Sequence, residues 1–95
     1  MTIAQQVRQH LRSGKPYDGP QIETGEITID PQDMRVIGPA PRYLNITAML
    51  LDSAPPRSFS FTDGVLTLNL LPAALRYRPL YWDDYDIIAF ERIDA

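Results

Sequence analysis

Residues 57–71 read RSFSFTDGVLTLNLL, and this stretch decides the fold class of the chain. Asp63-Gly64 is a preferred pair for a two-residue hairpin turn, because glycine takes a positive φ without steric cost and aspartate tolerates it. A turn at this pair sets Phe59 opposite Leu68, so that aromatic and aliphatic side chains share one face and hydroxyl and amide side chains share the other. Turn chemistry and alternation therefore agree on an antiparallel hairpin.

Outward from this hairpin, the apolar pattern continues to favour short strands. Residues 21–29 surround a glycine with isoleucines, residues 34–37 form a candidate short strand, and residues 43–51 alternate over most of their length. Residues 86–93 carry apolar side chains on both sides, which is typical of a central strand covered on both faces. The chain is therefore expected to build a small antiparallel sheet of about 4–6 strands.

Two segments favour helices. Thr2 followed by Gln5 has the form of a capping box, and the apolar residues over about 3–13 fall on one side of a helical projection. A second, short helix is expected near 72–78, because a proline suited to a first helical turn is followed there by good helix formers. The fold class is thus α+β, with the sheet packed against one N-terminal amphipathic helix, and residues 1–95 form one domain.

Composition excludes several classes of chemistry. The chain has 95 residues, a formal net charge of −3, no cysteine and one histidine, His10. These counts leave no disulfide, no thiol nucleophile and no pair of imidazoles for a metal. The serines and glycines match no nucleophile or phosphate-binding motif, so no catalytic residue, cofactor or metal is expected. The sequence has no apolar run typical of a membrane helix or signal peptide, which favours a cytoplasmic location.

The densest aromatic and charged stretch lies close to the C-terminus. Tyrosine, tryptophan and arginine are the residue types enriched at binding hot spots, because they bury a large area and still complete a hydrogen bond. The predicted partner-binding residues are Tyr77, Tyr81, Trp82, Asp83, Asp84, Tyr85 and Asp86. The competing interpretation is that the aromatic side chains cap the core and that the aspartates form a solvated loop, with a hard-cation site as a lesser alternative.

The predicted N-terminal helix offers a second candidate surface. Arginine and glutamine read the guanine and adenine edges in a major groove, and these types gather on the exposed face of the helix. The candidate nucleic-acid-binding residues are Gln5, Arg8, Gln9 and Arg12. The negative net charge argues against binding to a phosphate backbone, and an ordinary solvated helix face accounts for the same residues.

The first hypothesis is therefore a non-enzymatic, small acidic protein-binding module that occupies a surface of a partner protein. Its size and composition are those of inhibitors, immunity proteins and phage accessory or structural proteins, of which anti-CRISPR proteins are one example, but no motif identifies a family. The expected partner is another protein with a basic surface rather than nucleic acid or a membrane, and homo-oligomerisation stays open. The alternative is a DNA-associated regulator that uses the N-terminal helix, and a cation-dependent enzyme comes third.

Overall fold

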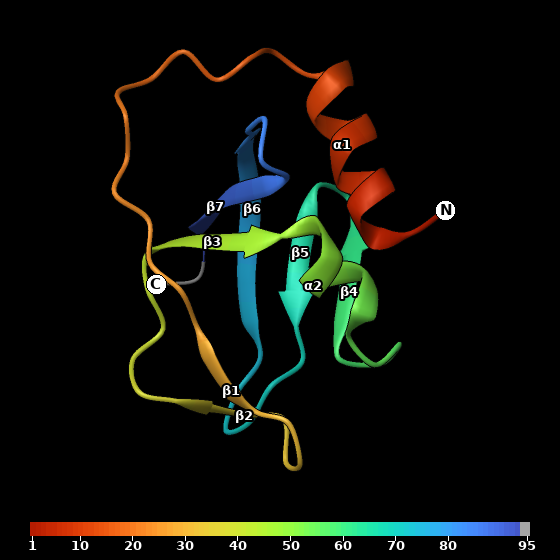
Figure 1. Ribbon diagram of the computed structural model, residues 1–95, viewed down its shortest axis with the longest axis vertical. Helices are drawn as coiled ribbons and strands as arrows, with labels where there is room; N and C mark the ends of the chain where they lie inside the picture. The colour runs from red at the N-terminus through yellow and green to blue at the C-terminus, as the bar shows by residue number, and fades with distance from the viewer. Residues whose placement is uncertain (94–95) are drawn as a thin grey trace.

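The computed structural model describes residues 1–93 as an antiparallel sheet with two helices and a separate hairpin (Figure 1). The elements are α1 (Ile3–Ser13), β1 (Thr28–Asp30), β2 (Arg35–Ile37), β3 (Tyr43–Thr47), α2 (Ala48–Ser53), β4 (Phe59–Thr62), β5 (Val65–Leu68), β6 (Leu75–Trp82) and β7 (Ile87–Arg92). The main sheet has five strands in the order β3-β7-β6-β5-β4, and β1 pairs with β2 in a two-stranded sheet. The predicted α+β fold class is confirmed.

The hairpin of β4 and β5 has the predicted register. Phe59 pairs with Leu68, and every other pair follows from a two-residue turn. Asp63 and Gly64 both have positive φ angles, 56° and 77°, as the mirror-image turn of a tight hairpin requires. The alternation also holds, because Phe59 and Leu68 are buried in the core while Ser60 is exposed.

Substitution of Gly64 by alanine is expected to lower the free energy of unfolding by about 1–2 kcal/mol, because a side chain at positive φ clashes with the backbone. The new Cβ would also lie 2.8 Å from Cε1 of His10, whose ring packs edge-on against Phe61 at 5.6 Å between ring centroids. Gly64→Asn is the matched control, since asparagine tolerates the left-handed region and adds the same Cβ. Urea unfolding measures the free energy of unfolding of both variants. Equal losses would show that contact of the new Cβ with His10, and not the positive φ, causes the destabilisation.

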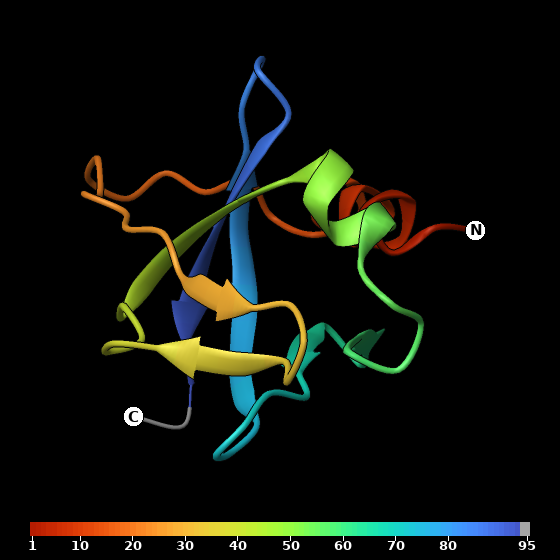
Figure 2. The same ribbon diagram turned by 60° about the horizontal axis from the view of Figure 1, so that its bottom comes forward.

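Helix α1 forms over the predicted residues and packs on the sheet through its apolar side. The predicted capping box is present: the amide of Gln5 donates to Oγ1 of Thr2 at 3.2 Å, and the amide of Thr2 donates to Oε1 of Gln5 at 2.9 Å. Val7 is fully buried, and the helix contacts α2, β4 and β6. Figure 2 shows α1 and α2 side by side, and a bond of 3.0 Å from the amide of Ala4 to Oδ1 of Asp52 joins them. Neither helix of residues 1–93 is long and apolar enough to cross a membrane.

Strand β7 is an inner strand covered on both faces, as its apolar pattern predicts. It pairs with β3 on one side and with β6 on the other. Ile88, Ala89 and Phe90 are all buried, so side chains on both faces are shielded from water.

The strand predicted over 43–51 ends earlier, at Thr47. The side-chain oxygen of Thr47 accepts a hydrogen bond of 3.2 Å from the amide of Leu50 and caps α2, so the chain turns into a helix. The apolar residues Met49 and Leu51 at the end of this segment suggest a strand covered on both faces, but Met49 is 79% exposed and that interpretation is wrong.

The prediction of a short helix near 72–78 is wrong. Residues 75–82 form β6, the longest strand of the sheet, and the two alanines before it lie in an exposed turn. Pairing with β5 on one side and β7 on the other outweighs the local helix propensity of a few residues.

The strands predicted over 21–29 and 34–37 form only in part. Thr28–Asp30 and Arg35–Ile37 pair with each other as β1 and β2. Gly25 instead makes an isolated parallel bridge to Leu44 of β3, with hydrogen bonds of 2.8 and 2.9 Å that tie this segment to the edge of the main sheet.

Candidate functional site

Tyr77 lies in the core rather than at the candidate surface. Its side chain is fully buried, and its hydroxyl donates a hydrogen bond of 2.7 Å to the carbonyl oxygen of Pro41. A strand directs alternate side chains to opposite faces, and Leu75 and Tyr77 are both on the buried face of β6. Its burial removes Tyr77 from the predicted set of partner-binding residues.

The turn between β6 and β7 is held by a network of hydrogen bonds. Oδ1 of Asp83 accepts from the amide of Tyr85 at 2.8 Å and from the amide of Ile87 at 3.0 Å. Asp86 has a φ of 60°, and its amide donates to the carbonyl of Asp83 at 3.3 Å. This is a tight turn closed by one residue in the left-handed region, a common three-residue hairpin loop. The carbonyl of Asp86 also accepts from the amide of Ala48 at 2.9 Å, which attaches the turn to the start of α2.

The apex of this turn, which we call the hairpin tip, consists of Asp84, Tyr85 and Asp86. Tyr85 is 85% exposed, and both aspartates are exposed. Met49, the second residue of α2, is 79% exposed and follows the residue bonded to the tip. A large aromatic side chain therefore projects into water from a backbone that hydrogen bonds hold in place, with an exposed aspartate on either side of it in the sequence.

Asp83 is expected to stabilise the turn, although it carries the same charge as its exposed neighbours. Asp83→Ala removes the acceptor of two amides and should lower the free energy of unfolding by about 1–2 kcal/mol. Asp84→Ala should change it by no more than about 0.5 kcal/mol, because Asp84 is exposed. Urea unfolding and hydrogen exchange at the Ile87 amide measure both effects. Asp83→Asn retains a carbonyl acceptor and should behave like wild type; losses of equal size at positions 83 and 84 would contradict this role.

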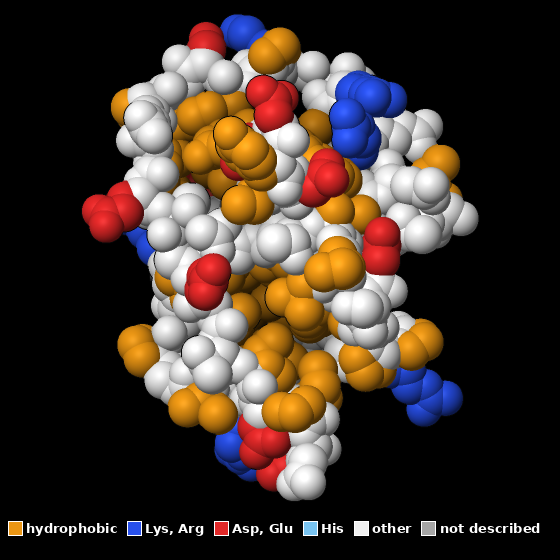
Figure 3. All heavy atoms as spheres, viewed as in Figure 1, with side chains coloured by type: hydrophobic (Ala, Val, Ile, Leu, Met, Phe, Trp, Pro, Cys, Tyr) orange, Lys and Arg blue, Asp and Glu red, His pale blue; other side chains and the backbone are white. Residues whose placement is uncertain are grey.

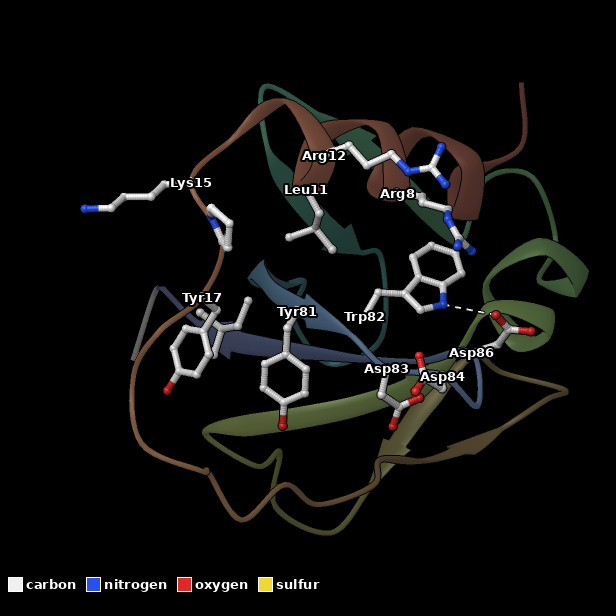
Figure 4. A pocket seen from close by; sticks show the side chains of 12 residues that line it. Arg8, Leu11, Arg12, Lys15, Tyr17, Tyr81, Trp82, Asp83, Asp84 and Asp86 are labelled. Carbon is white, nitrogen blue, oxygen red and sulfur yellow. Dashed lines mark hydrogen bonds between the residues drawn. The ribbon is translucent and has the colours of Figure 1, made fainter.

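A groove of about 470 Å³ separates α1 from the β6–β7 turn (Figure 4). We call it the charged groove, because one wall is basic, the opposite wall is acidic, and aromatic side chains lie between them. Its defining residues are Arg8 and Arg12 on the basic wall, Asp83, Asp84 and Asp86 on the acidic wall, and Tyr17, Tyr81 and Trp82 between the walls. Lys15 also lines the groove, but its side chain points away from the aspartates. Figure 3 shows acidic and basic side chains gathered near each other over this part of the molecule, beside hydrophobic ones.

Contacts within the groove fix Trp82 in place. The guanidinium carbon of Arg8 lies 5.0 Å from the centroid of the Trp82 ring, a cation–π distance. The indole nitrogen of Trp82 donates to Oδ1 of Asp86 at 3.1 Å. Trp82 is half-buried. Through these two contacts it links the basic wall to the acidic wall and holds the side chain of Asp86 in the hairpin tip.

Tyr17 and Tyr81 form the other aromatic contact of the groove. Their ring centroids are 5.4 Å apart, and both side chains are half-buried. Burial, followed by repulsion from nearby groups that are negative when ionised, raises the pKa of Tyr17 above its ordinary value of 10.0. The hydroxyl therefore keeps its proton at neutral pH and donates a bond of 2.7 Å to the carbonyl of Pro20.

The two alternative binding surfaces predicted from the sequence, the exposed face of α1 and the aspartates of the β6–β7 turn, face each other across one groove. The predicted nucleic-acid-binding residues Gln5, Arg8, Gln9 and Arg12 are all exposed on α1, but two of them form the basic wall opposite the aspartates. Sequence reasoning missed Leu11, Lys15 and Tyr17 as parts of this site. No local signal could have found them, because the groove exists only once α1 docks beside β6.

The aspartates of the tip are not arranged as a metal centre. Within the chain from residue 1 to residue 93, no three acidic or histidine side chains converge on a point where a cation could bind. Oδ1 of Asp83 accepts hydrogen bonds from two amides of the turn, and Oδ1 of Asp86 accepts one from the indole of Trp82.

Comparisons with protein-family models, with curated proteins and with solved structures found no significant match.

Proposed function

We propose that this protein is a non-enzymatic protein-binding module that uses the hairpin tip to occupy a surface of a partner protein. The observation that carries the proposal is the exposure of Tyr85, 85%, on a turn whose backbone is already fixed. Aromatic side chains of this size bury 150–250 Å² (an approximate range) at an interface and are enriched among hot spots.

The rigidity of the turn supports a role in recognition. Ordering a mobile loop on binding costs about 0.5–1.5 kcal/mol for each immobilised side chain, and a loop held before binding avoids part of this cost. Asp83 holds the amides of the turn, Ala48 holds the carbonyl of Asp86, and Trp82 holds the side chain of Asp86. The tip therefore presents Tyr85 from a backbone that is held in place before binding.

The charges beside Tyr85 describe the expected partner. Asp84 and Asp86 adjoin Tyr85 in the sequence and are exposed with it, so a complementary surface carries an apolar pocket with basic side chains at its rim. The net charge of −3 favours encounter with such a basic surface over long range.

Nucleic-acid binding through α1 is the second candidate, because Gln5, Arg8, Gln9 and Arg12 are exposed together. The acidic wall argues against it: phosphates approaching Arg8 and Arg12 would also approach three carboxylates.

Affinity capture from a lysate of the source organism, with and without nuclease, tests these candidates. We expect a protein that is retained after nuclease treatment, lost with Tyr85→Ala combined with Asp84→Ala, and kept with Arg8→Ala combined with Arg12→Ala. Recovery of nucleic acid alone, lost with the arginine variant at raised salt, would replace the proposal by the second candidate.

A further inference from the structure

The charged groove has a basic wall and an acidic wall that no ion pair joins within residues 1–93. Among residues 1–93, Arg78 and Glu91 form the ion pair, and neither Arg12 nor Lys15 is paired with a carboxylate across the groove. Arg8 stacks on Trp82 without a carboxylate partner. The two walls lie opposite each other (Figure 4).

Each wall is unfavourable by itself. Arg8 and Arg12 are four residues apart on α1, where like charges destabilise a helix by about 0.2–0.5 kcal/mol, and α1 contains no acidic residue to offset them. Asp83, Asp84 and Asp86 crowd three carboxylates into one tight turn. A surface of opposite sign would relieve both kinds of repulsion.

The groove is complementary to itself. The two arginines of the basic wall and the three carboxylates of the acidic wall lie on opposite sides of an aromatic strip. A two-fold axis through that strip places the basic wall of one protomer against the acidic wall of its partner, and it does so twice, as in any isologous interface.

We propose that a second copy of this chain docks against the charged groove, in a two-fold homodimer in which Arg12 faces the partner's Asp84. Exposed ion pairs contribute about 0.2–1 kcal/mol each, so the dimer is weak and sensitive to salt. The inference goes beyond the proposed function, because the dimer forms without any other protein. Asp84 belongs to both surfaces, so dimerisation and partner capture compete.

Sedimentation of charge-reversal variants tests the dimer. The wild-type chain is expected to approach twice the monomer mass as its concentration rises. Arg12→Glu and Asp84→Arg should each stay monomeric, because each variant sets like charges against each other at both symmetry-related contacts. An equimolar mixture of the two variants should recover the dimer, because both contacts between positions 12 and 84 in the mixed dimer again join opposite charges. Raising salt from roughly 0.1 M to 1 M shortens the Debye length from about 10 to about 3 Å and should dissociate the wild-type dimer.

Matched controls place the same charge changes outside the groove. Arg57→Glu and Asp33→Arg alter exposed residues that do not line it and should leave the dimer intact. Urea unfolding of all four variants should match wild type, since each substitution is at an exposed position. A wild-type chain that stays monomeric overturns the proposal, as does a dimer that survives both groove reversals or a mixture that stays monomeric. None of these outcomes depends on the partner protein, so the proposed function stands or falls separately.

Discussion

Tyr77→Ala is expected to lower the free energy of unfolding by about 3–5 kcal/mol, the range for deleting a large aromatic side chain from a core. Tyr77 is fully buried, and on β6 it pairs with Leu66 on one side and with Arg92 on the other. Its hydroxyl also satisfies the carbonyl of Pro41. Domains have total stabilities of about 5–15 kcal/mol, so this single change should bring the protein close to unfolding. Urea unfolding followed by circular dichroism measures the loss.

Two further variants separate the contributions at this position from a general effect of removing tyrosine. Tyr77→Phe keeps the ring and removes the hydroxyl, so it should cost only about 1–2 kcal/mol. Tyr85→Ala removes the same side chain from an exposed position and should change the free energy of unfolding by no more than about 0.5 kcal/mol. Comparable losses for Tyr77→Ala and Tyr85→Ala would show that the described core is wrong.

The affinity for the captured partner should fall by at least about 30-fold with Tyr85→Ala, which corresponds to the roughly 2 kcal/mol that defines a hot spot. The reason is geometric: Tyr85 is the most exposed of the large hydrophobic side chains in residues 1–93, and the turn beneath it is fixed. Isothermal titration calorimetry with the purified partner measures the change.

Ile37→Ala is the control for this loss. Ile37 is 57% exposed, but it lies on β2, at the opposite end of the molecule from the β6–β7 turn in Figure 1. Its truncation should leave the affinity unchanged. Tyr85→Phe should retain most of the affinity if the ring itself fills a pocket. A loss with Tyr85→Ala no greater than that with Ile37→Ala would remove the hairpin tip as the anchor.

The part of the fold that the sequence could predict rests on short-range signals. The Asp63-Gly64 turn and the capping box of α1 involve residues at most three apart, and both form as predicted. β7 was also predictable, because its apolar residues cover two faces in an unbroken run. In each case the local pattern and the tertiary environment favour the same structure.

The secondary-structure predictions are wrong where contacts with residues distant in the sequence determine the local structure. Ala73 and Ala74 favour a helix locally, yet the chain after them is held by β5 and β7 as a strand. Thr47 ends β3 because it caps α2, whose first amide is bonded to the turn between β6 and β7. Neither partner is adjacent in the sequence.

The incorrect prediction of a helix near 72–78 also affected the predicted partner-binding residues. Once residues 75–82 are a strand, Tyr77 falls on its buried face, while the turn beyond Trp82 carries Tyr85 outward. Without the strand, the aromatic residues from 77 to 85 cannot be sorted into core and surface. The sequence also could not predict that Arg12 and Asp84 lie on opposite sides of one groove, because this depends on how α1 packs beside β6.

Hydroxyl-radical footprinting of the protein, free and bound to its captured partner, tests the central claim most directly. In the free protein Tyr85, Met49 and Met1 should be oxidised readily, since they are 85%, 79% and 78% exposed, and the buried Tyr77 should be protected. In the complex we expect protection of Tyr85 and continued oxidation of Met1. Oxidation of Tyr85 at the same rate in the free and bound protein would contradict the account.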